Sequence, residues 1–346
     1  MTRKSGSDDR KVRGSKIRTS KTNKQQDRRQ KELQRMSQSV DDGAEELERS
    51  DLSESVAIAE QPFIETDEIR QLKRRLHRWL EADRPVHLIG PTGCGKTALA
   101  IDAARERDRP VVWINGDAEL NTSDLVGEYA EEERYSERDK YIHNVVKSKD
   151  IIRDRWVDNP LTLAVRDGGT LVYNEFSRTK PVANNVLLSV FEEGVLELPG
   201  KRGGSRYVEV HPEFRAILTS NSVEYAGVHE PQDALLDRLV GVHMDFYDYE
   251  SEVKIVSEHL DEGLTQSQIE SVVAVFRELR DELDITVGTR AEIMAAEGLA
   301  AAGLEDEGTV RDVCVDVLAS KVAEYDEVED LRDRIDDVLE ASELPI

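Results

Sequence analysis

The stretch Pro85-Val-His-Leu-Ile-Gly-Pro-Thr-Gly-Cys-Gly-Lys-Thr-Ala-Leu-Ala100 runs from an apolar segment through a glycine-rich turn into a segment of helical character. It contains the pattern G-x-x-x-x-G-K-S/T, with Gly90 and Gly95 at the required spacing and Lys96 and Thr97 at its end. The glycines let backbone N–H groups approach phosphate oxygens without a Cβ in the way, and the N-terminus of the following helix favours an anion. The stretch therefore predicts a phosphate-binding loop between a strand and a helix.

Different residues of this loop are expected to make different contacts with a nucleotide. Lys96 would reach the β and γ phosphates, and the Thr97 hydroxyl would be a ligand of Mg²⁺. A glycine-rich turn without a ligand is the alternative, but all the motif positions and both flanking segments fit a nucleotide site. The residues expected to bind the nucleotide are Gly90, Pro91, Thr92, Gly93, Cys94, Gly95, Lys96 and Thr97.

The charge of the chain is unevenly distributed. The formal net charge of the 346 residues is −25, yet residues 1–40 carry thirteen Lys and Arg against four Asp and Glu, which leaves −34 on residues 41–346. Such an acidic body is similar to those of proteins from extreme halophiles, which stay soluble in high salt and repel themselves when unscreened. An ordinary acidic cytoplasmic protein is the alternative. Either body would bind nucleic acid poorly, because phosphate groups carry the same sign of charge.

The cysteine content and the apolar runs indicate the compartment. The chain has two cysteines, too few for a disulfide framework, and Cys94 lies inside the glycine-rich turn. No run of eighteen apolar residues occurs, and the basic N-terminus is not followed by the apolar region of a signal peptide. These features predict a soluble protein of the reducing cytoplasm, without a membrane span.

Residues 1–60 have the composition of a disordered arm that begins basic and turns acidic. They are polar and almost free of clustered aromatic or β-branched residues, so they bury too little surface to fold alone. The basic half, from Lys11 to Arg29, could contact nucleic acid or an acidic partner through complementary charge. Because aromatic residues are not interleaved with the basic ones, a solvated tail is an equal alternative.

The remaining residues predict an α/β domain. Thr66 is a candidate N-cap for a helix whose apolar positions run from Ile69 to Leu80. Short apolar segments separated by helical patterns indicate the buried strands of a parallel sheet flanked by helices. After the strand that leads into the glycine-rich turn, the expected strands are Val111–Ile114, Leu171–Tyr173, Arg215–Leu218 and Val242–Phe246.

Three parts of the chain are therefore expected. Residues 1–60 form the arm, residues 61–249 the nucleotide-binding α/β domain with five parallel strands, and residues 250–346 a small helical domain. The charged segment Gly116–Asn159 fits neither pattern and is not assigned. The helices expected in the last part include Ser267–Leu283, Arg290–Ala301 and Thr309–Tyr325.

Two residues at the end of the third expected strand are placed for catalysis. Glu175 is the candidate base that activates a water molecule. Asn174 precedes it, at a position where an Asp normally contacts the metal ion or its bound waters. The amide oxygen of Asn174 can accept hydrogen bonds but carries no negative charge. Slow or partner-dependent hydrolysis is the physical implication. For Glu175 taken alone, the alternative is an acidic residue at a strand end with no catalytic role.

Three further residues are candidates for contacts with the γ-phosphate or the attacking water. The fourth expected strand ends near Asn221, beside the strand that leads to the phosphate loop, where an amide could orient the water. Arg238 follows a helical stretch and Arg290 opens a C-terminal helix, and a guanidinium fork binds phosphate oxygens in a fixed plane. Each has an ordinary alternative, which is turn chemistry for Asn221 and a surface ion pair for each arginine.

Taken together, the motifs resemble those of the MoxR-like branch of the AAA+ ATPases over roughly residues 62–320. The ordered set that carries this resemblance is Gly90–Thr97, Leu171–Glu175, Thr219–Asn221, Leu235–Arg238 and Gly288–Arg290. A closer resemblance is to the GvpN family of gas vesicle proteins from halophilic archaea. The segments that carry it are Pro85–Leu88, Tyr173–Arg178, Asn184–Leu188, Glu192–Pro199 and, in the arm, Lys11–Arg18.

The resemblance implies roles for individual positions. The segment Gly90–Thr97 matches Walker A, Asn174 and Glu175 match Walker B, Asn221 matches sensor 1, Arg238 the arginine finger and Arg290 sensor 2. Asn174 departs from the Asp of the family pattern, which implies slow hydrolysis. Arg178 matches a basic position that faces a neighbouring subunit, and Lys201–Arg206 falls at a hairpin that could contact a substrate.

The resemblance also implies an ATPase (EC 3.6) with ATP and Mg²⁺ as cofactors. A homo-oligomeric ring, expected to be a hexamer, would assist gas vesicle assembly in the cytoplasm, in contact with gas vesicle proteins. Two alternatives stay open: a MoxR-type chaperone that activates a metalloenzyme, and a nucleotide-binding assembly component that does not hydrolyse. The metal would be held by Thr97 and Asn174, and the catalytic residues would be Glu175, Asn221, Arg238 and Arg290.

Overall fold

The structure is a computed structural model, which describes eight segments of the chain. They are residues 63–138, 148–201, 203–221, 232–260, 263–283, 285–302, 307–322 and 325–341. The expected arm, residues 1–60, lies outside them, and so does its basic segment Lys11–Arg18. Among the helices of the described segments, none has the length and the apolar composition that a membrane crossing requires.

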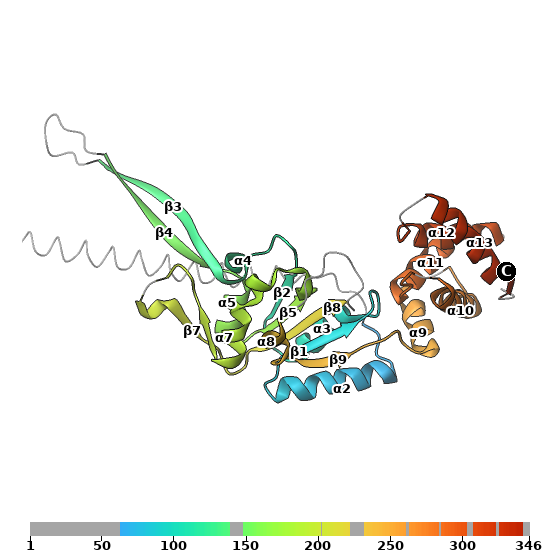
Figure 1. The fold of residues 1–346 in the computed structure, drawn as a ribbon, viewed down its shortest axis with the longest axis horizontal. Helices are drawn as coiled ribbons and strands as arrows, with labels where there is room; N and C mark the ends of the chain where they lie inside the picture. The colour runs from blue at the N-terminus through green and yellow to red at the C-terminus, as the bar shows by residue number, and fades with distance from the viewer. Residues whose placement is uncertain are drawn as a thin grey trace, which may run out of the picture. The chain divides into compact units, whose positions relative to one another are not determined.

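Five strands form one parallel sheet in the order β2-β5-β8-β1-β9 (Figure 1). Their bounds are β1 Val86–Gly90, β2 Val111–Asn115, β5 Thr170–Asn174, β8 Arg215–Asn221 and β9 Val240–His243. Most residues of β5 and β8 are buried, as expected for central strands of a sheet that is covered on both faces. The predicted α/β fold with five parallel strands is confirmed.

The register brings the ends of neighbouring strands together. Gly90 at the end of β1 lies opposite Asn221 of β8, and Asn115 at the end of β2 lies opposite Asn174 of β5. All these residues lie at the carboxyl edge of the sheet, which is where ligands bind in open α/β sheets. The polar residues that the sequence places after separate strands therefore converge on one edge.

The predicted position of the fifth strand is wrong by two residues at its start and by three at its end. The strand was expected at Val242–Phe246 but runs from Val240 to His243. Pairing begins where the Val240 amide donates to the Pro85 carbonyl, and it stops soon after Met244 donates to Ile89, because β1 turns into the phosphate loop. Met244 is buried in the core without belonging to the strand, so apolar character extended the predicted strand too far.

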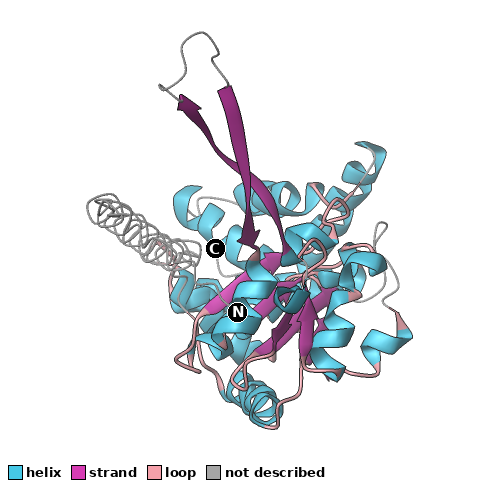
Figure 2. Ribbon diagram, turned by 90° about the vertical axis from the view of Figure 1, so that its left-hand side faces the viewer, coloured by secondary structure: helices cyan, strands magenta, loops and turns pink. Residues whose placement is uncertain are grey.

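Helices cover both faces of the sheet (Figure 2). Their bounds are α2 Asp67–Glu81, α3 Lys96–Arg105, α5 Pro160–Asp167, α6 Pro181–Asn184, α7 Val186–Glu192 and α8 Asp233–Leu236. The predicted N-cap of α2 is confirmed, because the Thr66 hydroxyl accepts from the Ile69 amide at 3.3 Å. Leu76 and Leu80 of α2 and Leu99 of α3 are almost fully buried, and they join β1 in one hydrophobic cluster.

The unassigned segment Gly116–Asn159 forms a short helix and a long hairpin. Helix α4, Thr122–Val126, begins with a capping box of Asn121 and Asp124. It leads into β3, Gly127–Arg138, which pairs with the antiparallel strand β4, Ser148–Asp158. Figures 1 and 2 show these strands as a two-stranded ribbon that extends away from the sheet and its helices. The sequence of these strands is rich in charged residues and lacks the apolar alternation by which strands are predicted.

A second, shorter hairpin meets the base of this ribbon. Strands β6, Val195–Glu197, and β7, Tyr207–Glu209, are antiparallel, and the segment Lys201–Arg206 lies in their connection, as the family resemblance implied. The Tyr129 hydroxyl donates to the Gly200 carbonyl at 3.2 Å, and the Lys201 ammonium lies 5.1 Å from the centre of the Trp156 ring. The connection of the short hairpin therefore contacts the base of the long one.

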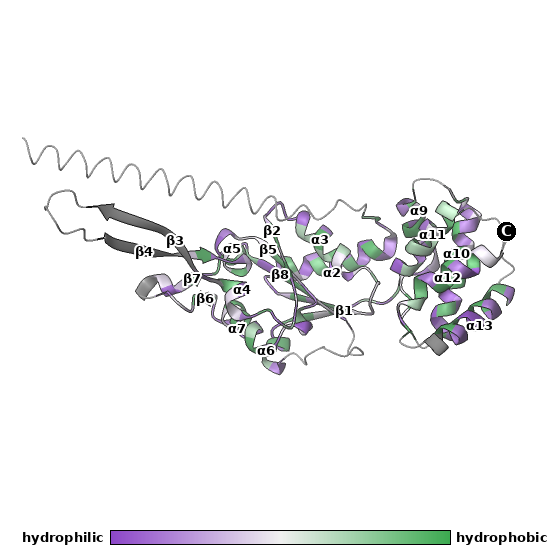
Figure 3. Ribbon diagram, turned by 90° about the horizontal axis from the view of Figure 1, so that it is seen from above, coloured by the Kyte–Doolittle hydropathy of each residue, from purple (hydrophilic) through white to green (hydrophobic). Residues whose placement is uncertain are grey.

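The residues after the sheet are helical. The helices are α9 Tyr249–His259, α10 Gln266–Glu282, α11 Thr289–Ala302, α12 Glu307–Ala319 and α13 Tyr325–Ala341. Figure 3 shows hydrophobic and hydrophilic residues along them, and the buried residues of all five helices form a second hydrophobic cluster. The predicted helix Thr309–Tyr325 is wrong at its end, because α12 stops at Ala319 and Tyr325 begins α13. The domain boundary at residues 249 and 250 stays a prediction.

A buried histidine of β1 makes stability depend on pH. His87 is 5% exposed, and its Nε2 shares a hydrogen bond with the Ser220 hydroxyl at 2.7 Å. Burial, with a smaller contribution from His243, lowers the pKa of His87 to about 4. As pH falls from 6.5 toward 4, His87 binds a proton in the unfolded chain but stays neutral in the folded chain. The free energy of unfolding therefore decreases.

We expect this effect to be measurable by comparison with His87→Gln. Between pH 7 and pH 5 the parent should lose about 2 kcal/mol more of its free energy of unfolding than the variant does. Denaturant unfolding at the two pH values measures the difference, because the other titrating groups contribute to both proteins alike. Equal losses in the two proteins would show that His87 is not kept neutral in the fold.

Candidate functional site

The backbone of the glycine-rich turn has the conformation that its sequence predicts. Gly93 and Gly95 have φ angles of +86° and +85°, a region that other residues rarely adopt. A Cβ on Gly90 would lie 2.5 Å from the Met244 carbonyl oxygen, so this position also requires glycine. Helix α3 begins at Lys96, directly after the turn, and its N-terminal amides therefore face the same space as the turn.

The Lys96 ammonium lies inside the turn. Its Nζ donates to the Pro91 carbonyl at 2.6 Å and to the Gly90 carbonyl at 3.0 Å, and the residue is 6% exposed. Burial lowers the pKa of Lys96, while the charges of Cys94 and Glu175 act in the opposite direction. A buried cation held by two neutral carbonyls is well suited to receive a phosphate, because an anion offers stronger charge-assisted hydrogen bonds.

Asn174 connects the turn to the end of β8. Its Oδ1 accepts hydrogen bonds from the hydroxyls of Thr97 at 2.7 Å and Thr219 at 2.9 Å. Its Nδ2 donates to Oδ1 of Asn115 at 2.9 Å. Because the Thr97 hydroxyl donates its proton to Asn174, its lone pairs remain available to a cation. Thr97 and Asn174 thus lie together, as a shared role at a metal requires.

Glu175 is held from two directions. Its Oε1 accepts from Nδ2 of Asn221 at 3.2 Å, and its Oε2 accepts from Nη1 of Arg178 at 2.9 Å. Its backbone is left-handed, with φ of +48°, and its amide donates to the Thr219 hydroxyl at 3.0 Å. Such a conformation costs about 1 kcal/mol or more in a residue other than glycine, and residues that adopt it are enriched at active sites. The structure therefore brings Glu175 and Asn221 together.

Two findings at Glu175 go beyond the sequence analysis. Arg178, which the family pattern places toward a neighbouring subunit, forms an ion pair with Glu175 of its own chain and is 60% exposed. Gly116 is needed for close approach, because a Cβ there would lie 2.1 Å from the Glu175 carbonyl oxygen. The Gly116 amide donates to the Asn174 carbonyl at 2.7 Å. A glycine after β2 permits this close approach, but the sequence alone does not predict it.

Arg290 lies near the turn, in a segment from the far end of the chain. A Cβ on Gly93 would lie 3.4 Å from Cα of Gly288 and 3.9 Å from Cβ of Arg290. A Cβ on Gly288 would lie 2.7 Å from the Thr92 carbonyl oxygen. The segment Gly288–Arg290 therefore packs directly against the glycine-rich turn, and Arg290 is the second residue of helix α11, Thr289–Ala302.

Behind this segment lies a buried charge cluster made of Glu252, Arg277, Arg280 and Glu292. Both carboxylates are fully buried, and Nη2 of Arg280 donates to Glu252 at 2.9 Å and to Glu292 at 2.6 Å. Arg277 bonds the other oxygen of Glu252. Burial, and next the charge of Glu252, raise the pKa of Glu292 to about 8, so Glu292 keeps its proton near neutral pH. No motif in the sequence indicates this cluster.

Arg238 occupies a different part of the domain. Its guanidinium bonds the Glu192 carboxylate of α7 and the Ala234 carbonyl of α8, and its side chain is 26% exposed. Among the contacts of the described residues, none joins Arg238 to Lys96, Glu175 or Asn221 of the same chain. The structure therefore does not bring Arg238 to the site that the other candidates form.

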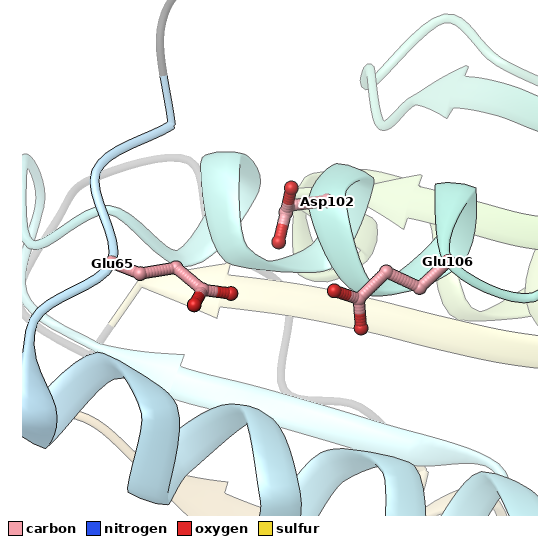
Figure 4. A group of neighbouring side chains, drawn as sticks. All are labelled: Glu65, Asp102 and Glu106. Atoms are coloured by element: carbon pink, nitrogen blue, oxygen red, sulfur yellow. The ribbon is translucent and has the colours of Figure 1, made fainter.

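A group of three carboxylates elsewhere in the domain has the spacing of a metal site. Glu65, Asp102 and Glu106 point toward a common space (Figure 4). The ammonium of Lys73 fills that space, with Nζ 2.6 Å from Glu65 and 2.5 Å from Asp102 and Glu106. These ion pairs raise the pKa of Lys73 against the cost of its burial. The group is thus an ion-pair cluster that joins α3 to the chain around α2.

The chain is similar to known proteins over most of its length. The sequence profile of the AAA domain (dynein-related subfamily) matches residues 85–239. The chain is 65% identical over 343 residues to the gas vesicle ATPase GvpN of Haloferax mediterranei, with 97% of each chain covered. It is 64% identical over 341 residues to the gas vesicle ATPase GvpN1 of Halobacterium salinarum, with 97% of this chain and 98% of that one covered. It is also similar to protein NorQ of Paracoccus denitrificans, at 27% identity over 62% of this chain and 73% of that one.

Proposed function

The chain belongs to the GvpN family of gas vesicle ATPases, and from this premise we propose that it hydrolyses ATP in the presence of Mg²⁺ and thereby assists gas vesicle assembly. The observation that supports the proposal most is the convergence of Lys96, Thr97, Asn174, Glu175 and Asn221 at one edge of the sheet. A cation for phosphate, an oxygen pair for the metal and a carboxylate with an orienting amide are the groups that phosphoryl transfer to water requires.

In this proposal each side chain has one task. Lys96 leaves its two carbonyl partners and bonds phosphate oxygens, with Gly90–Thr97 supplying backbone amides. Glu175 accepts the proton of the attacking water, and Asn221, which already bonds its carboxylate, orients that water. Arg290 is the second residue of a helix beside the turn and would bond phosphate oxygens of the nucleotide. Arg178 must give up its ion pair with Glu175 before the carboxylate can act as a base.

The donor set at Thr97 and Asn174 fits Mg²⁺. Magnesium prefers oxygen ligands and keeps several waters, and a threonine hydroxyl with free lone pairs is one such ligand. The Asn174 carbonyl oxygen, which accepts from Thr97, would hold that hydroxyl or a metal-bound water. Mg²⁺ held there would supply positive charge that stabilises the negative charge developing on the phosphate during transfer.

Asn174 is expected to slow the reaction relative to an aspartate at the same position. A carboxylate accepts hydrogen bonds about twice as strong as those of an amide and adds a charge near the metal. We therefore expect Asn174→Asp to raise the hydrolysis rate roughly three- to tenfold at limiting Mg²⁺. Hydrolysis rates of both proteins across a Mg²⁺ titration measure the effect. Superimposable titration curves would show that Asn174 has no influence on the metal.

The proposal extends to partners. We place the chain in a homo-oligomeric ring, expected to be a hexamer, in which Arg238 acts on the nucleotide of a neighbouring subunit. Its position away from its own Glu175 and the partial exposure of its side chain, 26%, support that arrangement. The loop Lys201–Arg206 between β6 and β7 would contact a gas vesicle protein, and the complex would work in the cytoplasm beside the vesicles.

A chaperone that activates a metalloenzyme is the second candidate, because the chain is also similar to NorQ. A nucleotide-binding component that does not hydrolyse is a third, because Walker B carries Asn174. Deletion of the gene in its native host, followed by complementation with the parent or with Glu175→Gln, separates the three. The proposal expects that vesicles are lost on deletion and return only with the parent. Normal vesicles after deletion would contradict the assembly role, and full rescue by Glu175→Gln would contradict the need for hydrolysis.

A further inference from the structure

Arg280 of helix α10 contacts residues of two neighbouring helices and of two segments outside helices. Its Nη2 donates to both buried carboxylates, Glu252 of α9 and Glu292 of α11, and its Nε donates to the Val287 carbonyl at 2.7 Å. Its guanidinium also lies over the Phe246 ring, 4.0 Å from the ring centre. One planar guanidinium thus joins helices α9, α10 and α11, the segment before α9 and the segment before α11.

Two of these partners adjoin the segment that packs on the phosphate loop. Val287 directly precedes Gly288, whose Cβ, if present, would lie 2.7 Å from the Thr92 carbonyl oxygen and 3.1 Å from Phe246. The Phe246 ring therefore lies between the Arg280 guanidinium and Gly288. Arg280 fixes the peptide that enters Gly288–Arg290 on one side and the ring that supports it on the other.

We propose that Arg280 is a positioning residue for nucleotide binding, which holds the segment Gly288–Arg290 against the phosphate loop so that Arg290 points at the nucleotide. The inference rests on the proposed function, because Arg290 needs a nucleotide to act on. The chemistry suits arginine in particular. A lysine ammonium in the same place could pair with the Glu252 carboxylate, but it has no planar guanidinium to bond Val287 and both glutamates together or to stack on Phe246.

The neighbouring Arg277 provides a matched control. It bonds the same glutamate, Glu252, but its second bond goes to the Tyr247 carbonyl at 3.0 Å and not to the segment before Gly288. Substitution of either arginine by lysine keeps the charge of the cluster and disturbs its packing. Only substitution of Arg280 also releases Val287 and Phe246.

The test measures the affinity of the full chain for MgADP in high salt, together with melting temperatures without nucleotide. We expect Arg280→Lys to weaken MgADP binding roughly tenfold, the size of one lost hydrogen bond to a charged group. Arg277→Lys should lower the melting temperature comparably and leave the affinity within about twofold of the parent. The double variant Arg280→Lys with Arg290→Ala should bind no more weakly than Arg290→Ala alone, because both act through one contact.

Other results overturn the inference in recognisable ways. If Arg280→Lys binds MgADP as the parent does, or if its effect adds fully to that of Arg290→Ala, Arg280 does not act through Arg290. If Arg277→Lys weakens binding as much, the effect is a general loosening of the helices. If the parent itself does not bind MgADP, the proposed function fails and the inference fails with it. If the parent binds MgADP but the variants do not behave as expected, only the inference fails.

Discussion

Replacement of Arg238 by alanine is expected to leave ATP affinity close to that of the parent and to lower the hydrolysis rate by about 10³- to 10⁵-fold. An arginine that stabilises charge on the transferred phosphoryl group acts mainly in the transition state and adds little to ground-state binding. In its own chain Arg238 bonds Glu192 and Ala234 and does not contact the catalytic residues, and for this reason we propose that it acts on the nucleotide of a neighbouring subunit. Rates of steady-state hydrolysis and nucleotide affinities measure the two effects separately.

A mixture of two inactive proteins tests whether Arg238 acts between subunits. In a ring that contains both Arg238→Ala and Glu175→Gln subunits, an intact Glu175 site can lie beside an intact Arg238, so part of the activity should return. If the mixture stays inactive although mixed rings form, Arg238 works within its own subunit or is only structural. Glu192→Gln serves as the control for structure, because it removes the partner of Arg238 and leaves the guanidinium in place.

The substitution Lys96→Ala should weaken ATP binding by at least about a hundredfold. It removes the one ammonium inside the glycine-rich turn, and two charge-assisted hydrogen bonds to phosphate contribute about this much. Binding of a fluorescent ATP analogue measures the loss, with the melting temperature as a check that the variant folds. Lys254→Ala is a matched control, because that ammonium binds the Glu65 carbonyl on the surface. Unchanged affinity in Lys96→Ala would contradict the assignment of the loop.

The order of elements around the sheet could be predicted because local signals were strong. The glycine-rich turn fixes one strand and one helix, and the N-cap Thr66 fixes the start of α2. Where tertiary contacts decide, the sequence was insufficient. The fifth strand ends at His243 because its partner β1 ends, although the chain stays apolar as far as Phe246. The hairpin of β3 and β4 was missed because its sequence is rich in charged residues and has no apolar period by which strands are predicted.

The candidate site could be predicted in part for a geometric reason. Carboxyl ends of adjacent parallel strands meet at one edge, so residues after β5 and β8 had to lie near the turn after β1. The ion pair of Arg178 with Glu175 and the cluster around Arg280 could not be predicted. The partners of Arg280 lie far from it in sequence, and the family pattern had placed Arg178 toward a neighbouring subunit. Neither interaction belongs to a motif with fixed spacing.

The central claim, that this site hydrolyses ATP with Glu175 as the base, is tested most directly by phosphate release at saturating ATP and Mg²⁺ in high salt. Glu175→Gln is the matched variant, because it keeps the size of the side chain and one of the two acceptor oxygens that bond Asn221 and Arg178. We expect the parent to release phosphate over many turnovers and Glu175→Gln to bind ATP equally well while its rate falls by about 10²- to 10⁴-fold. A parent that binds ATP without turnover, or a variant that hydrolyses as fast as the parent, would contradict the claim.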